Sequence, residues 1–343
     1  MLFNLPLISV NLLTYNGKKY IKACLDSVLA QSYPNVEILI IDNASTDRIE
    51  NYLKSLPTND YRLRLIFNQK NVGFAAGHNQ GIKESRGEFI LCLNQDVVLD
   101  KDFVKKAIEV LEEDDKIAAV QGKLLRFPGA APILGGSPRI THIDTTGLVI
   151  LKNRRIISRG QGQIDEGQYE SSEEIFGADG AAPVYRRNAL EDIKINGEYF
   201  DEDFFCYKED VDSAWRLRLY GWKTIYQPKA AAWHRRGAGD SAATNYFKII
   251  QERLKINKFA KYLSFKNQRL MQIKNEQVWL LLKHLPWFLP KEIAAWIYVI
   301  LFERHAVKAI KDLFKQMPGA WQKRRVIMAK KRVVGREMER WFR

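Results

Sequence analysis

The first 125 residues alternate between short apolar runs and longer stretches in which apolar residues recur at helical spacing. The apolar runs lie at residues 7–13, 36–41, 63–68 and 89–93, and the helical stretches at 19–31, 46–55 and 74–84. Strands that alternate with helices are typical of a parallel, doubly wound sheet. We therefore expect an α/β fold, with a Rossmann-like, mostly parallel sheet flanked by helices. Residues 127–175, rich in Gly, Pro and Ser, predict irregular loops with a few short strands.

The positive charge of the chain is concentrated in its last third. Residues 1–240 hold 31 Lys and Arg against 33 Asp and Glu, whereas residues 241–343 hold 23 against 7, so the whole net charge of +14 arises there. The second part also carries five of the eight tryptophans, and its pattern is helical from residue 246. We expect a main domain at 1–240 and a basic, Trp-rich helical extension at 241–343.

Other features of the whole chain exclude several classes of protein. With 46% hydrophobic residues the chain is too apolar to be disordered. Cys24, Cys92 and Cys206 form neither a disulfide framework nor a metal-binding spacing, which favours a reducing compartment. The first residues lack the basic region and cleavage site of a signal peptide. The longest uninterrupted apolar run, residues 293–302, is about half of what crosses a bilayer, so we expect no conventional transmembrane helix.

Polar residues follow three of the expected strands, at the places where parallel sheets bind their ligands. Thr14 and Tyr15 follow the first strand, Asp42 follows the second, and Asp96 follows the fourth. Asp42 could accept hydrogen bonds from a ribose or a base edge, and Asp96 could ligate a Mg²⁺ or Mn²⁺ ion that bridges phosphates. The alternative is that both aspartates only form turns or cap helices.

Residues 200–222 hold a dense group of acidic residues in an aromatic setting. A carboxylate held away from water has a raised pKa and can serve as a general base, and Glu209 and Asp210 are the candidates. Asp210 or Asp212 is also expected to cap the helix that follows. Capping explains one acid of this group and leaves the others without a role.

One histidine and two arginines occur together at residues 230–239. The imidazole of His234 could complete a metal site, and Arg235 or Arg236 could hold phosphate. A lone histidine is more often structural, so both interpretations stay open on these residues alone. The glycines of residues 71–82 resemble a phosphate-binding loop only loosely, because neither the P-loop spacing nor the dinucleotide-binding spacing is present.

Taken together, these segments resemble the inverting family 2 glycosyltransferases of the GT-A fold, and within that family the bacterial rhamnosyltransferases. The matching segments occur in the family's order: SVNLLTYNG, DNASTD, NVGFAAGHNQGI, NQD, FGADGAAPVYRR, FDEDFFCYKEDVDSAWRLRLYGW and the histidine of AAAWHRRG. The resemblance covers residues 5–240, and seven segments in order are more specific than any one of them.

The resemblance implies roles for single residues. Asp210 would be the catalytic base, and Glu209 would face the acceptor or support the base. The NQD segment stands where the family has its DxD motif, so Asp96 would be the main direct ligand of Mn²⁺ or Mg²⁺, with His234 as a further ligand. The residues implied to bind the nucleotide sugar are Thr14, Tyr15, Asp42, Asn71, Asn94, Arg235 and Arg236.

The resemblance also implies a reaction. A sugar would pass from a nucleotide sugar to a hydroxyl of a glycan or lipid-linked saccharide in bacterial surface polysaccharide synthesis. The expected donor is dTDP-rhamnose, and UDP- or GDP-sugars are alternatives. A non-catalytic nucleotide-sugar-binding scaffold and a nucleotidyltransferase are the competing classes. The nucleotidyltransferase predicts a Gly-rich N-terminal loop carrying Arg and Lys, which residues 12–20 match poorly.

The basic C-terminal region has three interpretations. A basic, Trp-bearing amphipathic segment can lie on an anionic membrane surface, stack on nucleic acid bases, or form a solvated helical cap on the main domain. Membrane binding suits the resemblance, because many such enzymes extend lipid-linked glycans. We expect a cytoplasmic protein, peripheral at the inner face of the plasma membrane, that binds no nucleic acid. Pro286 and Pro290 are expected to break helices in this region.

Overall fold

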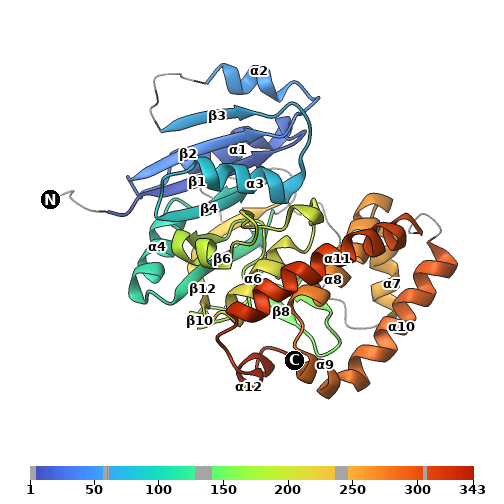
Figure 1. Ribbon diagram of the computed structural model, residues 1–343. Helices are drawn as coiled ribbons and strands as arrows, with labels where there is room; N and C mark the ends of the chain where they lie inside the picture. The colour runs from blue at the N-terminus through green and yellow to red at the C-terminus, as the bar shows by residue number, and fades with distance from the viewer. Residues whose placement is uncertain (1–4, 57–59, 61, 128–140, 236–245, 304–306) are drawn as a thin grey trace.

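The computed structural model describes residues 5–56, 60, 62–127, 141–235, 246–303 and 307–343 (Figure 1). A ten-stranded sheet forms its centre, and β8 (Leu148–Ile150) pairs with β9 (Ile156–Ser158) in a separate small sheet. The strands of the main sheet are β1 (Ile8–Thr14), β2 (Val36–Asp42), β3 (Leu63–Phe67), β4 (Phe89–Asn94), β5 (Val97–Leu99), β6 (Ile117–Arg126), β7 (Ile143–Thr145), β10 (Glu173–Glu174), β11 (Val184–Arg186) and β12 (Lys223–His234). The expected α/β class is confirmed.

The order of the strands places the expected polar residues at one edge. The path runs β3-β2-β1-β4-β11-β6-β12-β10, and the first four strands pair in parallel. Their register sets Thr14 opposite Asp42 and Leu13 opposite Asn94. Because parallel strands end at the same edge, the residues that follow β1, β2 and β4 meet there. β12 pairs antiparallel with β5, which sets His234 opposite Val97.

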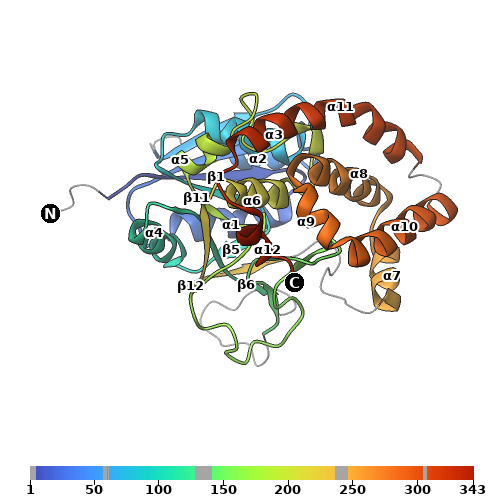
Figure 2. The ribbon, with the colours of Figure 1, turned by 60° about the horizontal axis from the view of Figure 1, so that its bottom comes forward.

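Helices cover both faces of the sheet (Figure 2). The helices of the first part are α1 (Lys18–Leu29), α2 (Ile49–Lys54), α3 (Gly73–Glu84), α4 (Phe103–Glu113), α5 (Arg187–Ile193), the 3-10 helix η1 (Glu202–Phe204) and α6 (Glu209–Leu219). In α1, Ile21, Cys24, Leu25 and Val28 are buried at helical spacing. They join α2 and α4 in one hydrophobic core, whereas α5 and α6 contribute to a second core on the other face.

Further helices follow residue 240, and most of them pack against this second core. They are α7 (Tyr246–Lys255), α8 (Lys258–Asn275), α9 (Val278–Lys283), α10 (Leu285–Phe302), α11 (Val307–Lys330) and α12 (Gly335–Glu339). Leu270 of α8 and Leu313 of α11 belong to the same core as Trp215 of α6. Packing therefore continues across residue 240, although the charge of the chain changes there.

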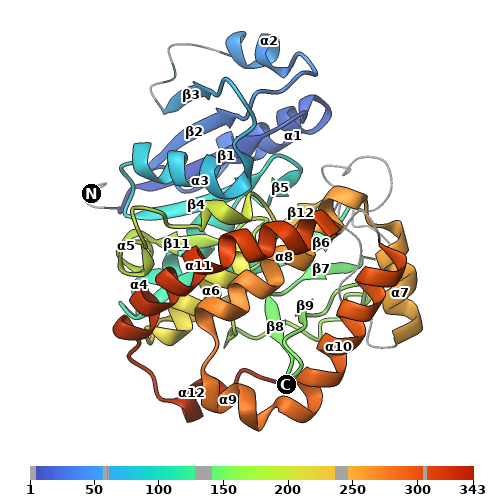
Figure 3. The same ribbon diagram turned by 45° about the vertical axis from the view of Figure 1, so that its right-hand side comes forward.

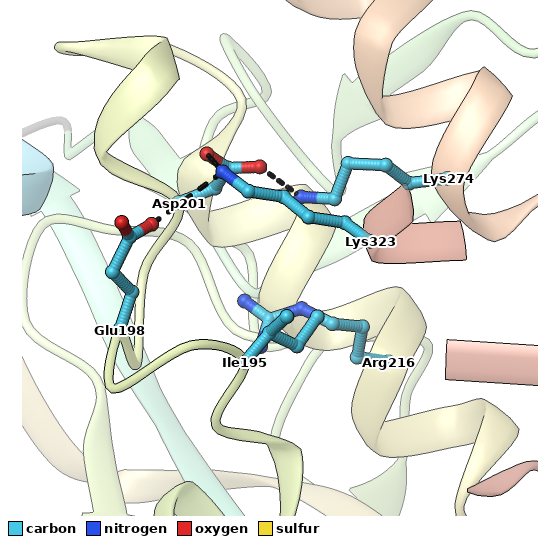
Figure 4. A pocket seen from close by; sticks show the side chains of 6 residues that line it. All are labelled: Ile195, Glu198, Asp201, Arg216, Lys274 and Lys323. Carbon is cyan, nitrogen blue, oxygen red and sulfur yellow. Dashed lines mark hydrogen bonds and ion pairs between the residues drawn. The ribbon is translucent and has the colours of Figure 1, made fainter. Parts of the chain in front are cut away.

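Buried ion pairs add to this packing (Figure 4). Asp201, just before η1, pairs with Lys323 of α11 through Oδ1 (2.5 Å) and with Lys274 of α8 through Oδ2. Lys274 also lies 2.9 Å from Asp212 of α6. All four side chains are less than 10% exposed, so the loss of one partner would leave an uncompensated buried charge.

The prediction that Pro290 breaks a helix is wrong. Pro286 lies in the first turn of α10, where its missing N–H costs nothing, and Pro290 lies inside the same helix. One backbone hydrogen bond, to the carbonyl of residue 286, is lost, and the helix continues to Phe302. Within the described residues α10 is the one helix long and apolar enough to cross a membrane, and only 6% of it is buried. This finding rests on length and composition alone, and the expectation of no conventional transmembrane helix stays a prediction.

Candidate active site

The end of β1 and the turn after β4 form the first part of the site. Gln95 Oε1 accepts hydrogen bonds from the Thr14 hydroxyl and from the Tyr15 amide (2.9 Å), and Gln95 Nε2 donates to the Tyr15 carbonyl (3.1 Å). The ring of Tyr15 is 44% exposed, which leaves it available to a planar ligand. The sequence assigned no role to Gln95, although it lies within the NQD segment.

The residues after β2 form the second part. Asp42 is 4% exposed, and its Oδ1 accepts a hydrogen bond from the Ser45 hydroxyl (2.5 Å). Asn43 donates through Nδ2 to Asn71 Oδ1 (2.9 Å) and to the Gly73 carbonyl (3.1 Å). Asn71 Oδ1 also accepts from the Gly73 amide (2.9 Å). Asn71 therefore holds the start of α3 in place, and its side-chain oxygen is already occupied.

Asp96, His234 and Asp144 form a row at the end of β12. His234 Nε2 lies 3.6 Å from Asp96 Oδ1, and His234 Nδ1 lies 2.8 Å from Asp144 Oδ2. Asp144 is completely buried, and His234 is 7% exposed. Burial lowers the pKa of His234, but the hydrogen bonds to Asp144 and Asp96 outweigh it and raise that pKa to about 10. Two carboxylates around one ring make this position favourable for positive charge.

These residues fit a divalent cation that takes further ligands from elsewhere. Carboxylate and imidazole are donors that Mn²⁺ accepts, and atoms 3.6 Å apart can both reach one ion at about 2.1 Å. Asp144 would orient the imidazole of His234, as carboxylates behind metal-binding histidines do. In the described part of the chain no group of three or more His, Cys, Asp or Glu side chains could hold an ion. A cation here would need oxygen atoms from a bound anion and from water.

Asp210 lies in the first turn of α6. Its Oδ2 accepts a hydrogen bond from the Gly180 amide (3.2 Å), and its Oδ1 accepts one from the Val211 amide (2.8 Å). Burial and then the Asp179 carboxylate raise the pKa of Asp210 to about 6. The side chain nevertheless keeps some exposure, as a group that exchanges protons with a ligand needs. A carboxylate with this pKa suits general base chemistry near neutral pH.

Glu209 lies behind Asp210 and is nearly enclosed. It is 6% exposed, and its Oε2 is buried with no hydrogen-bond partner in the described residues. Burial and then the Asp210 carboxylate raise the pKa of Glu209 well above its usual range. The predicted aspartate cap is wrong, because α6 begins at Glu209 without a side-chain cap. Asp212 pairs with Arg216 of the same helix instead (3.0 Å).

The turn at residues 179–181 joins Asp210 to the edge of the sheet. The Asn94 amide donates to the Ala181 carbonyl (2.9 Å), while Gly180 beside it binds Asp210. One edge of the sheet thus gathers most of the predicted site residues: Thr14, Tyr15, Asp42, Asn71, Asn94, Asp96, Asp210 and His234. The sequence did not indicate Asp179, which is contributed from the segment between β10 and β11.

The arginine at the end of β12 lies beside the Asp96 turn. The Arg235 amide donates to the Asp96 carbonyl (3.0 Å), and the Arg235 guanidinium lies over the rings of Phe127 (4.8 Å) and Tyr20 (5.8 Å). The backbone of Arg235 therefore adjoins the Asp96 turn, and its guanidinium lies over these two aromatic rings. Arg236 lies outside the described residues.

The loop before Asp210 is strained and is held by a residue of the C-terminal helices. Three of its residues have left-handed φ angles, namely Phe205 (63°), Tyr207 (69°) and Lys208 (79°). Such residues cost roughly 1–3 kcal/mol each, so the surroundings must hold them. Asn267 of α8 donates through Nδ2 to the carbonyls of Phe204 (2.9 Å), Cys206 (2.9 Å) and Tyr207 (2.8 Å). No sequence pattern pointed to Asn267.

The same loop also contacts the start of α3. The Phe205 carbonyl accepts hydrogen bonds from the amides of Phe74 (2.6 Å) and Ala75 (3.2 Å). Gly73 has a φ angle of 88°, and a Cβ atom there would lie 2.5 Å from the Phe205 carbonyl oxygen. Only glycine allows this close approach. The glycine segment and the loop before Asp210 therefore form one connected unit.

Residues 9–193 match the family model described as Glycosyl transferase family 2. Among curated proteins, the poly-beta-1,6-N-acetyl-D-glucosamine synthase of Staphylococcus epidermidis is 27% identical over 230 residues, which cover 66% of this chain and 49% of that protein. The protein of the same name from Staphylococcus aureus strain COL is 28% identical over 226 residues, with the same coverage. The chain thus spans about half the length of the curated relatives it matches.

Solved structures show a similar fold. TarS 1-349 of S. aureus in complex with UDP-GlcNAc has a TM-score of 0.54 and 15% identity, covering 94% of this chain and 90% of that chain. The mannosyltransferase PcManGT of Pyrobaculum calidifontis, in complex with GDP-Man and Mn²⁺, has a TM-score of 0.52 and 17% identity, covering 96% and 86%. These likenesses concern the fold alone, and with them the expected GT-A fold is confirmed.

Proposed function

Because the chain belongs to glycosyl transferase family 2, we propose that it transfers a sugar from a nucleotide sugar to a hydroxyl group, with inversion at the anomeric carbon. The observation that supports this most is the environment of Asp210. This carboxylate is partly exposed, has a pKa of about 6, and is joined by the turn at 179–181 to the edge that carries Asp96 and His234. We assign catalysis to residues 1–240 and membrane binding to residues 241–343.

The proposed reaction is a single displacement. As the acceptor oxygen attacks, Asp210 takes the hydroxyl proton, a new bond forms to the anomeric carbon, and the bond from that carbon to the diphosphate oxygen breaks. Glu209 supports Asp210 from behind, where its enclosed carboxyl group excludes water. Arg235 lies close enough to the Asp96 turn to neutralise charge on the leaving diphosphate.

A divalent cation belongs to this proposal. Asp96 and His234 would hold Mn²⁺ or Mg²⁺, whose chemistry there is to neutralise diphosphate charge. The residues favour cation binding because two carboxylates surround His234.

The nucleotide would be bound by residues at the ends of β1, β2 and β4. Asp42 would accept hydrogen bonds from the ribose or base, Tyr15 would cover the base, and Thr14 and Asn94 would line the same edge. Asn71 would act indirectly, through the start of α3.

Two nucleotide sugars are candidates for the donor. The resemblance to rhamnosyltransferases implies dTDP-rhamnose. The curated relatives instead carry the name of an N-acetylglucosamine polymer synthase, and TarS was crystallised with UDP-GlcNAc. We retain dTDP-rhamnose as the first candidate and UDP-GlcNAc as the second. The proposed acceptor is a glycan or lipid-linked saccharide of the bacterial surface, reached at the cytoplasmic face of the plasma membrane.

A thermal-shift panel with dTDP-rhamnose, UDP-GlcNAc and GDP-mannose, each with and without Mn²⁺, tests the proposal. A ligand at about 100 times its Kd stabilises the fold by about 2.7 kcal/mol, which raises Tm by several degrees. We expect one donor to do so in a Mn²⁺-dependent way, and that donor to be consumed in a transfer assay. Stabilisation without hydrolysis or transfer would favour the scaffold. A response to nucleoside triphosphates alone would favour the nucleotidyltransferase.

A further inference from the structure

Exposed apolar side chains are concentrated on the C-terminal helices. Among the described residues, all but three of the exposed large hydrophobic side chains lie after residue 249, and the three exceptions are Leu5, Tyr15 and Ile164. The densest part is α9 and α10, which lie at the edge of the molecule away from β1–β3 (Figure 1). Two of the three tryptophans there are about half exposed, Trp279 at 51% and Trp287 at 54%. A soluble surface rarely shows so many neighbouring apolar groups without a partner.

The two faces of α10 differ in character. On the outer face, residues four apart are exposed: Leu285 (37%), Leu289 (45%), Ile293 (50%), Ile297 (52%) and Leu301 (62%). The inner face carries the only charges of the helix, Lys291 and Glu292. Glu292 pairs with Arg269 of α8 (2.5 Å), and Trp296 packs on Phe265 of α8 with ring centroids 5.1 Å apart. The outer face is therefore free of charge over the whole helix, about 27 Å long.

We propose that this outer face of α9 and α10, defined by Val278, Trp279, Leu282, Leu285, Trp287, Leu289, Ile293, Ile297 and Leu301, lies flat in the headgroup region of an anionic lipid bilayer. A flat position buries the apolar face and keeps the inner face on the protein. A spanning position would put Lys291 and Glu292 near the bilayer centre and break the ion pair with Arg269, so it is disfavoured. Half-exposed tryptophans suit the interface itself.

The charges around this face fit anionic lipid. Lys308, Lys311 and Lys315 are exposed on α11, which begins beside the end of α10 (Figure 3). Residues 241–343 contain 23 basic and 7 acidic side chains. Basic residues that border an apolar face add electrostatic attraction to lipid headgroups of negative charge. The last residues of the chain are less suited to binding lipid, because Met338 and Phe342 are buried in the protein interior.

The position of this face also bears on the acceptor, in a step that rests on the proposed function. The inner side of α10 packs on α8 through Trp296 and Glu292, and Asn267 of α8 holds the loop before Glu209. The membrane face and the base-bearing loop are thus on neighbouring parts of the molecule. A lipid-linked acceptor held at this face would be close to α8, which supports the loop before Asp210.

Flotation of the full chain with vesicles tests the proposal. The vesicles are phosphatidylcholine alone or mixed with phosphatidylglycerol, and the variant is Ile293→Asn with Ile297→Asn. The matched control is Ile164→Asn, a similarly exposed isoleucine of the first part (44%). Point variants are preferable to deletion of 278–343, because Lys323 and Phe342 of that segment are part of the buried interior.

We expect the wild type and Ile164→Asn to float with the mixed vesicles, less so at high salt, and the double variant to lose binding by about tenfold or more. Equal flotation of the double variant would overturn the proposal. So would resistance of the bound wild type to alkaline carbonate, which would mean a spanning helix. Sedimentation showing a wild-type dimer that the double variant lacks, with no vesicle binding, would assign the face to a second copy. Turnover of a water-soluble acceptor, measured in parallel, reports on the proposed function separately.

Discussion

Replacement of Asp210 by asparagine separates the chemistry from the stability of the fold. The amide keeps the shape of the side chain but cannot take a proton, so turnover should fall by about 10²–10⁴-fold, the usual worth of general base help. Donor binding should persist, because Thr14, Asp42 and Asp96 lie on other elements. The variant thus loses turnover while its donor-induced thermal shift is retained.

The same change should stabilise the protein at alkaline pH. The pKa of Asp210 is raised from 3.8 to about 6, so the folded state holds this proton more tightly than the unfolded state. The contribution is fully present below about pH 4 and is lost as the pH rises through about 6. At 1.36 kcal/mol per pKa unit the loss has an upper limit of about 3 kcal/mol. Partial exposure of Asp210, and one amide hydrogen bond that asparagine cannot accept, reduce the expected gain at pH 8 to about 1–2 kcal/mol.

Thermal unfolding at pH 8 and near pH 4, together with release of nucleoside diphosphate, measures both effects. The gain in Tm for Asp210→Asn should appear at pH 8 and vanish near pH 4. The kcat/KM of the wild type should decline below about pH 6, where the base is protonated. Asp115→Asn, at a fully exposed side chain, is the control and should change neither property. The reasoning fails if Asp210→Asn keeps more than about a tenth of the turnover, or if it is less stable than the wild type at pH 8.

Three further substitutions test the surroundings of the base and the cation. Asp96→Ala should weaken Mn²⁺-dependent donor binding in a calorimetric titration, and unchanged binding would indicate a metal-independent mechanism. Asp144→Asn leaves Asp96 and His234 in place but should lower the affinity for Mn²⁺ by about 10–100-fold. Paramagnetic resonance of free Mn²⁺ measures this affinity, and an unchanged value would mean that Asp144 only packs against His234. Asn267→Ala removes one donor from three carbonyls, and the Phe204 carbonyl keeps its hydrogen bond from the Cys206 amide. The variant should lower kcat by about tenfold with little change in donor KM, whereas a change in donor KM alone would contradict an effect through Asp210.

Local sequence signals were sufficient for the central sheet and for most of its ligand edge. The runs at 36–41 and 89–93 are buried throughout, because β2 and β4 are covered on both faces, and they are apolar apart from Glu37. Such short runs indicate either buried strands or buried helix segments. Their alternation with helical spacing then settles the choice. Once parallel pairing is assumed, Asp42 and Asn94 must meet at one edge, since each directly ends a strand.

The residues that hold the site in shape gave no such signal. Asp144 comes from a segment expected to be irregular and meets His234 across 90 positions of the chain. Asn267 is one polar residue of α8, and the spacing of apolar residues in this helix indicates which side is buried but not which loop Asn267 binds. The position of Pro290 inside α10 was also out of reach, because the sequence shows the lost hydrogen bond but not the tertiary contacts of Trp296 and Glu292 that keep the helix whole. Long-range contacts decide each of these cases.

The three carbonyls bound by Asn267 limit how this chain can exchange parts with its relatives. The family match ends at residue 193 and Asp210 lies soon after it, yet the loop before Asp210 accepts hydrogen bonds from α8. A chimera that joins the first part of this chain to another C-terminal region would remove the Asn267 donor from all three carbonyls. The Phe204 carbonyl would keep its hydrogen bond from the Cys206 amide, and each buried carbonyl left unpaired would cost about 1–3 kcal/mol. Any recombination of this chain, whether designed or natural, therefore has to keep α8 together with the loop before Asp210.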